Sequence, residues 1–273
     1  MRSNGCLRNT TVWFVGNSVQ RRRYFAAARL LNTSHGQVDD RIDEMRLCGQ
    51  GGAAAGKRLG QGSCYGPCTC GSRAPALGTE LIFLWQQRVY DASLRRVFLG
   101  EEPVSGRFMR ARDVVLINAG LDDIANSSCR VTWQRMQKEE APQIAALLSE
   151  ARRRLVRVVW LTTSPVCHAA WGLSLVQLSR TVNESNGIIA SALQRRERDG
   201  SDGRWRDASA AAGGGGVPLL DVSRLDGALS GCEGASALAN QACVCKRAYS
   251  DHVHPTMHHA QQQLPHILGL ACG

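Results

Sequence analysis

The strongest constraint on the fold is a repeated pattern: a short apolar run, then a turn residue, then a helix-forming stretch. Residues 11–16 (TVWFVG) are mostly β-branched or aromatic and end at a glycine, and residues 18–31 (SVQRRRYFAAARLL) then have helical character. A short run of this kind is typical of a strand that is buried on both faces. Because strands that alternate with helices form parallel sheets covered on both sides, the pattern predicts an α/β fold.

The same alternation continues along the chain. Further strands are predicted at 79–90, 112–120, 156–165 and 216–225, and further helices at 139–155 and 175–198. We therefore expect a three-layer α/β/α sandwich with a flavodoxin-like parallel sheet, formed by a single domain over residues 1–273. Two segments interrupt the pattern, a Cys- and Gly-rich loop at 48–78 and a stretch at 199–216 with the composition of a flexible surface insertion.

Composition narrows the classes of function. A chain of 273 residues with 44% hydrophobic residues can bury one sizeable core, and it contains no run of about 18 uninterrupted apolar residues that would predict a membrane span. The net charge of +10 comes almost entirely from arginine. The basic runs, such as QRRRY, lie in helical segments without interleaved aromatic residues that would stack on bases. We interpret these runs as solvated helix faces and expect no nucleic-acid partner.

The cysteines and the glycosylation motifs indicate a compartment. The chain has 11 cysteines and four Asn-x-Ser/Thr motifs, which begin at Asn9, Asn32, Asn126 and Asn183. Many cysteines are unusual in a cytosolic enzyme, so we expect disulfides, a glycoprotein and a location in the Golgi lumen or outside the cell. The first 16 residues contain no apolar stretch of signal-peptide length, and the native signal or anchor is therefore expected to lie outside this chain.

Polar residues follow several of the predicted strands. Ser18, Asn118, Gly120 and Ser164 all stand at predicted carboxyl ends, which is where parallel α/β sheets bind their ligands. A serine hydroxyl becomes a good nucleophile when a histidine takes its proton and a carboxylate orients that histidine. The stretch SDHVHPT contains a carboxylate and a histidine three residues apart, Asp251 and His254. The sequence therefore predicts a Ser18–His254–Asp251 catalytic triad.

Acyl transfer at a serine also needs hydrogen-bond donors for the negative charge that develops on the carbonyl oxygen. The backbone N–H of Ser18 is one candidate, because Ser18 stands at the start of a predicted helix. A backbone N–H of Gly49, within CGQGG, and the side-chain amide of Asn118 are two more. No metal and no cofactor is expected for this chemistry.

Three short stretches carry a family resemblance. FVGNSVQR, DVVLINAGLDD and SDHVHPT resemble blocks I, III and V of the SGNH (GDSL-like) hydrolase superfamily, and they appear in the order of that superfamily. The cysteines, the NAG form of block III and the Ser-Pro of WLTTSPVCH resemble the PC-esterase branch, which includes the trichome-birefringence-like polysaccharide O-acetyltransferases. The resemblance implies a serine esterase or O-acetyltransferase that acts on acetyl esters of carbohydrate or on another small ester.

Two positions depart from the superfamily pattern. Asn17 replaces the usual aspartate before the nucleophile, and Asp122 stands where a literal overlay places the oxyanion amide. A carboxylate at that position would repel the oxyanion, so we prefer Asn118 to Asp122 as the side-chain donor to the oxyanion. Two alternatives stay open at this point: a non-catalytic glycan-binding or scaffold protein on the same fold, and a zinc site formed by Cys243, Cys245 and nearby histidines. The Cys-x-Cys spacing argues against zinc, because zinc knuckles usually use Cys-x-x-Cys.

Overall fold

The fold is built around one mixed sheet of six strands. The computed structural model describes residues 4–38, 47–48, 69–86, 88–120, 132–163, 166–168, 173–199, 217–232, 237–251 and 254–272. Its strands are β1 (Thr11–Gly16), β2 (Thr69–Ala74), β3 (Thr79–Trp85), β4 (Val114–Asn118), β5 (Arg157–Leu161) and β6 (Leu219–Leu220).

The strand order confirms the predicted fold class. The order across the sheet is β2-β3-β1-β4-β5-β6, and every neighbouring pair is parallel except β2 with β3. The five parallel strands, taken alone and renumbered along the chain, follow the 2-1-3-4-5 order of flavodoxin-like sheets. The predicted α/β/α architecture with a flavodoxin-like parallel sheet is therefore present, with one antiparallel strand added at an edge.

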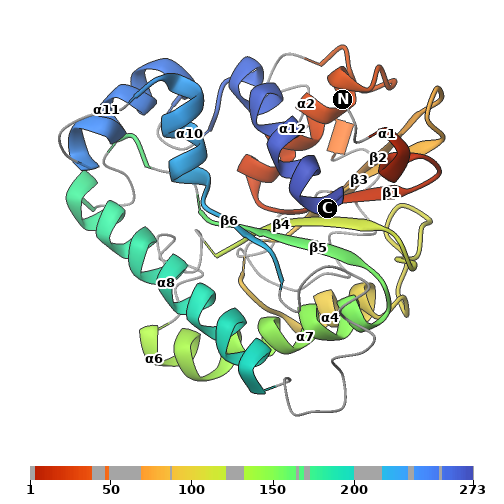
Figure 1. The fold of residues 1–273 in the computed structure, drawn as a ribbon, viewed down its shortest axis with the longest axis horizontal. Coiled ribbons are helices and arrows are strands. Elements are labelled where there is room, and N and C mark those ends of the chain that lie inside the picture. Colours follow the sequence, from red (N-terminus) through yellow and green to blue (C-terminus); the bar gives the residue numbers. More distant parts are fainter. Residues whose placement is uncertain are drawn as a thin grey trace.

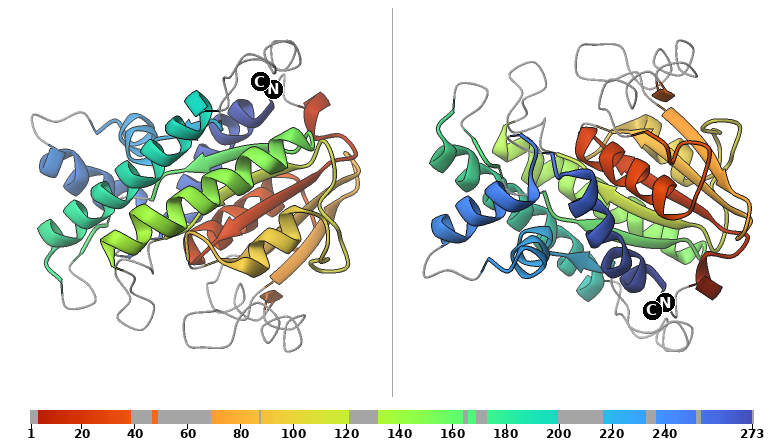
Figure 2. Two further views of the ribbon diagram at one scale, coloured as in Figure 1. Left: turned by 90° about the horizontal axis from the view of Figure 1, so that it is seen from below. Right: turned by 90° about the horizontal axis from the view of Figure 1, so that it is seen from above.

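Helices cover both faces of the sheet (Figures 1 and 2). On one face lie α2 (Ser18–Leu30) and α12 (Met257–Cys272), with α10 (Val222–Ser230) and α11 (Ala237–Ala248) beside them. On the other face lie α4 (Ala92–Phe98), α7 (Ala141–Arg153) and α8 (Leu175–Asp199), the last packed along α7. Short helices complete the described elements: α1 (Asn4–Leu7), α6 (Trp133–Arg135) and the π-helix η1 (Met136–Glu140).

Alternation along the strands divides the apolar core into two layers. In β1, Trp13 and Val15 belong to the cluster packed under α4, α7 and α8, whereas Val12 and Phe14 belong to the cluster packed under α2 and α12. Successive side chains of a strand point to opposite faces, so a strand that is apolar at every position must be covered on both sides. The continuous apolar runs in the sequence are explained by this two-sided burial.

Four disulfides are present among the described cysteines. They join Cys6 to Cys272, Cys48 to Cys70, Cys167 to Cys245 and Cys232 to Cys243. Disulfides persist in oxidising compartments, so this set is compatible with an extracellular or secretory location. Among the described residues, no helix combines the length and the apolar character that crossing a bilayer requires.

Three predictions about local structure need correction. The Cys- and Gly-rich segment 48–78 is not all loop, because its residues 69–74 form β2 and pair with β3. The strand predicted at 216–225 is only two residues long, and the chain then turns into α10. The basic run at the start of α2 is not a solvated face, since Arg21 and Arg23 are buried. Residues 200–216 of the predicted insertion lie outside the described residues.

Candidate active site

Ser18 is the first residue of α2, at the turn that follows β1. The helix is capped by Asn17, whose side-chain oxygen accepts a hydrogen bond from the backbone N–H of Val19 at 3.1 Å. Ser18 itself is therefore not the N-cap, and its hydroxyl is left for another partner. The neutral Asn17 performs the local task of capping, for which asparagine and aspartate are equally suited.

The turn before Ser18 depends on a glycine. A Cβ atom on Gly16 would lie 2.1 Å from the backbone oxygen of Asn118 on β4, which is the register partner of Gly16. The ends of β1 and β4 can approach this closely only because residue 16 has no side chain. Gly16 therefore fixes the position from which α2 starts.

Replacing Gly16 with alanine is expected to lower the free energy of unfolding by about 3 kcal/mol, because the new methyl group must push β1 away from the backbone of β4. Chemical denaturation measures this loss. Gly269→Ala is the matched control: Gly269 lies in α12 with no atom within 4 Å of an added Cβ, so stability there should stay the same or rise. A Gly16→Ala variant as stable as the control would show that the close approach is absent.

Asp251 and His254 lie on a loop between α11 and α12 that its own backbone hydrogen bonds hold in shape. The backbone N–H of Ser250 donates to the oxygen of His254 at 2.9 Å, and the N–H of Thr256 donates to the oxygen of Ala248 at 2.7 Å. Tyr249 and Pro255 form a β-bridge between these two bonds. Both ends of the loop are therefore tied together, which keeps Asp251 and His254 close to each other.

The loop places a carboxylate, an imidazole and a hydroxyl in series. The Nε2 atom of His254 lies 2.7 Å from the Oγ atom of Ser18, and its Nδ1 atom lies 2.8 Å and 2.9 Å from the two carboxylate oxygens of Asp251. The backbone N–H of His254 also donates to Asp251 at 2.9 Å. His254 is buried, and the side chain of Asp251 is 29% exposed. The three residues predicted from the sequence are thus brought together across 236 positions of the chain.

The hydrogen bonds indicate which ring nitrogen carries the proton. An ionised carboxylate only accepts hydrogen bonds, so the Nδ1 atom of His254 must donate to Asp251. In the neutral imidazole the Nε2 atom is then an acceptor, and the hydroxyl of Ser18 donates to it. A base with this tautomer and at this distance can take the proton of Ser18 when the oxygen attacks.

The predicted role of Asn118 as an oxyanion donor needs correction. Asn118 ends β4 and is buried, and its Nδ2 atom donates to the backbone oxygens of Leu161 at 3.0 Å and Thr162 at 2.8 Å. An amide nitrogen carries two hydrogens, and both are used here to hold the end of β5. The side chain of Asn118 therefore stabilises the sheet edge beside the site.

Of the two predicted donors that the structure describes, the backbone N–H of Ser18 is the one whose placement fits the role. Among the described residues it has no hydrogen-bond partner, and it lies at the positive end of α2. Gly49 lies outside the described residues, as do Asp122 and Ser164, so these predictions stay untested. Gly120 is described and follows β4 with a φ of 104°, and a Cβ there would lie 2.6 Å from Val89.

The two cysteines of the alternative zinc site, Cys243 and Cys245, are not available as thiolate ligands. Cys243 is bonded to Cys232 and Cys245 to Cys167, and a disulfide sulfur is not a thiolate ligand. Within the described part of the chain, no group of three or more His, Cys, Asp or Glu side chains is arranged to hold a metal ion.

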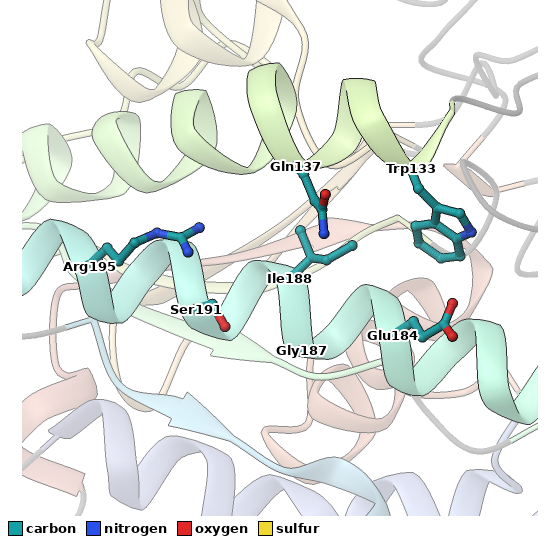
Figure 3. A pocket seen from close by; sticks show the side chains of 7 residues that line it. All are labelled: Trp133, Gln137, Glu184, Gly187, Ile188, Ser191 and Arg195. Atoms are coloured by element: carbon teal, nitrogen blue, oxygen red, sulfur yellow. The ribbon is translucent and has the colours of Figure 1, made fainter.

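A cavity of about 620 Å³ lies elsewhere, between the α6–η1 segment and α8 (Figure 3). It is lined by Trp133, Gln137, Glu184, Gly187, Ile188, Ser191 and Arg195. Trp133 stands at one end and Arg195 at the other, and neither Ser18 nor His254 is among the lining residues. Nothing in this cavity contributes to the Ser–His–Asp arrangement.

The structure also shows buried polar residues behind the loop that the sequence interpretation did not single out. Asp226, Tyr249, His259 and Gln263 are joined by hydrogen bonds and are nearly inaccessible to solvent. In sequence they resemble ordinary surface positions of helices.

Comparisons with known proteins give structural similarities at low sequence identity. No protein-family model and no curated protein matches the sequence. A variant of an acetyl-xylooligosaccharide esterase from Geobacillus stearothermophilus is similar over 97% of this chain and 95% of its own, with 12% identity and a TM-score of 0.48. A GDSL-like lipase from Bacteroides thetaiotaomicron is similar over 99% and 94%, with 14% identity and a TM-score of 0.44. A putative acylhydrolase from Bacteroides fragilis covers 100% and 95%, with 14% identity and a TM-score of 0.43.

Proposed function

We propose that the chain is a serine-dependent acyl esterase or O-acyltransferase of the SGNH type. The observation that carries this proposal is the series of short contacts from Ser18 through His254 to Asp251. Hydrogen-bonded series of this kind recur on unrelated folds wherever a serine is used as a nucleophile. The site stands at the carboxyl ends of β1 and β4, where α/β sheets place their ligands.

The first half-reaction forms an acyl-enzyme. The Oγ atom of Ser18 attacks the ester carbonyl carbon while His254 takes the hydroxyl proton, and the carbonyl electron pair moves onto the oxygen. The N–H of Ser18 faces that oxyanion, and Gly49 remains the predicted second donor. Collapse of the intermediate expels the alcohol, which receives its proton from His254. Asp251 holds the ring and stabilises the imidazolium that forms in between.

The second half-reaction decides between the two activities. His254 takes a proton from the acceptor, and the acceptor oxygen attacks the acyl carbon on Ser18. The intermediate then collapses, the bond between the acyl carbon and the Oγ atom of Ser18 breaks, and His254 returns the proton to that Oγ atom. Water as acceptor gives hydrolysis, whereas a sugar hydroxyl gives transfer, and exclusion of water favours the second. The resemblance to the PC-esterase branch directs the choice of substrate to acetyl esters of carbohydrates.

The proposal is tested by incubating the protein with p-nitrophenyl acetate and with acetylated oligosaccharides, with and without an unacetylated oligosaccharide as acceptor. We expect consumption of the acetyl ester in both cases. Release of acetate that the acceptor does not reduce identifies an esterase. Appearance of acetylated acceptor at the expense of free acetate identifies a transferase. Failure to consume any ester, with the protein folded and its disulfides formed, contradicts the proposed function.

A further inference from the structure

Behind the loop lies a chain of buried polar side chains that links both halves of the candidate site. Its centre is Asp226 on α10, which is fully buried. One carboxylate oxygen of Asp226 accepts a hydrogen bond from the hydroxyl of Tyr249 at 2.6 Å. The other lies 2.9 Å from the Nε2 atom of His259 and accepts a hydrogen bond from Gln263 at 2.5 Å. We refer to these four residues as the Asp226 cluster.

The Asp226 cluster holds the loop at both ends. Tyr249 stands five residues before His254, and His259 stands five residues after it, at the start of α12. A single carboxylate therefore anchors the segment that enters the loop and the helix that leaves it. Movement of Asp226 would change the separation of the two ends, and with it the position of His254.

The same network reaches the helix that carries Ser18. The side-chain oxygen of Gln263 accepts a hydrogen bond from the Nε atom of Arg23 at 2.9 Å, and Arg23 also donates to Gln20 at 3.0 Å. Gln20 in turn donates to the backbone oxygen of Leu116 on β4 at 2.6 Å. Gln20 and Arg23 stand two and five residues after Ser18 on α2, so the network joins the nucleophile helix to the histidine loop.

Burying these groups is costly unless each one is hydrogen-bonded. Arg23 and Asp226 are fully buried, and an uncompensated charge in such a place strongly destabilises a fold. Burial lowers the pKa of Arg23, while the nearby Tyr249 and Asp226 act in the opposite direction. An apolar core would be less demanding at these positions. What the polar network offers instead is fixed geometry, because each bond is satisfied in one arrangement only.

We propose that Asp226 and Tyr249 are positioning residues for His254, which keep its Nε2 atom within hydrogen-bond distance of Ser18. This inference rests on the proposed function of the Ser18–His254 pair. A displacement of about 1 Å at a reacting group can lower a rate about 100-fold, so a fixed loop has a direct consequence for catalysis.

The test compares two tyrosines that each lose one buried hydroxyl group. Tyr249→Phe removes a bond to Asp226. Tyr24→Phe is the matched control, because Tyr24 is also buried, and its hydroxyl contacts His35 and Ser72. For both variants, a fluorophosphonate titrates the active fraction, and the rate of labelling per active site is then measured together with kcat and KM for a small ester.

We expect Tyr249→Phe to keep a full active fraction and an unchanged KM, while kcat and the labelling rate constant fall about tenfold. Asp226→Asn removes the charge and should lower both about 100-fold. Tyr24→Phe should leave both rates at the wild-type value even where its melting temperature falls. The inference is overturned if kcat and the labelling rate constant per active site are the same in Tyr249→Phe and Tyr24→Phe. It is also overturned if Tyr249→Phe loses activity only because its active fraction is smaller.

A second readout does not depend on catalysis. Hydrogen exchange of the backbone amides of Ser250 and Thr256, which close the loop, should become at least tenfold faster in Tyr249→Phe and stay unchanged in Tyr24→Phe. Unchanged exchange in both variants contradicts a positioning role whether or not the protein is an esterase. If exchange is faster in Tyr249→Phe but the wild-type protein consumes no ester, the positioning role stands and the proposed function is wrong.

Discussion

Replacing Ser18 with alanine is expected to lower kcat for ester hydrolysis by about 10⁴–10⁶-fold, because no other described hydroxyl lies on the acceptor nitrogen of His254. The fold should not change. The helix cap is provided by Asn17 and not by Ser18, so the melting temperature should stay within about 2 °C of the wild type. Steady-state hydrolysis of a small ester and thermal unfolding measure the two quantities on the same sample.

The matched control is Ser93→Ala. Ser93 stands in the first turn of α4, and its hydroxyl contacts the carboxylate of Asp91, so it is a helix-start serine beside an acid with no histidine. This variant should keep its full activity. If Ser18→Ala retained more than about a tenth of the wild-type kcat, Ser18 would not be the nucleophile.

Replacing His254 with alanine should lower kcat by a similar factor, because the proton of Ser18 then has no acceptor. His258→Ala is the control, because His258 is exposed on α12 and outside these contacts. An equal loss in both variants would argue against a histidine base.

Replacing Asp251 with asparagine tests how far the orientation of the His254 ring, as distinct from its presence, contributes to proton transfer. The carboxylate accepts hydrogen bonds from both the ring and the backbone of His254. An amide in its place favours the other tautomer of the ring, which leaves a proton facing Ser18. The expected loss in kcat is about 10⁴-fold.

Sequence patterns predicted those parts of the fold that follow from local properties of the chain, such as apolar runs and turn residues. The boundaries of β1 were predicted at residues 11–16 and are those observed, since an apolar run that ends at a glycine leaves few alternatives. The Ser18, Asp251 and His254 arrangement was also predicted, because the chemistry needs these three types and the parallel sheet supplies the place. The distances between these three side chains could not be predicted from the sequence, because they depend on how distant segments pack.

What escaped prediction depends on tertiary contacts. The residues of β2, TCGSRA, have little strand propensity, and they form a strand because β3 offers an unpaired edge. Arg23 and Gln20 resemble surface residues, and they are buried because Gln263 and Leu116 supply partners from distant segments. The position of Asn118 in a motif suggests a donor to the oxyanion. In the structure its side-chain amide instead donates to the backbone oxygens of Leu161, at the end of β5, and of Thr162.

The most direct test of the central claim is covalent labelling of the disulfide-bonded protein with a fluorophosphonate, followed by mass spectrometry of the intact chain and its peptides. Such a probe reacts with a serine that a neighbouring base has activated. The account predicts one phosphonate per chain on the peptide that contains Ser18, and no label in Ser18→Ala or His254→Ala. A folded wild-type protein that takes no label, or takes it on another residue, would contradict the account. Absence of label would favour the non-catalytic glycan-binding alternative.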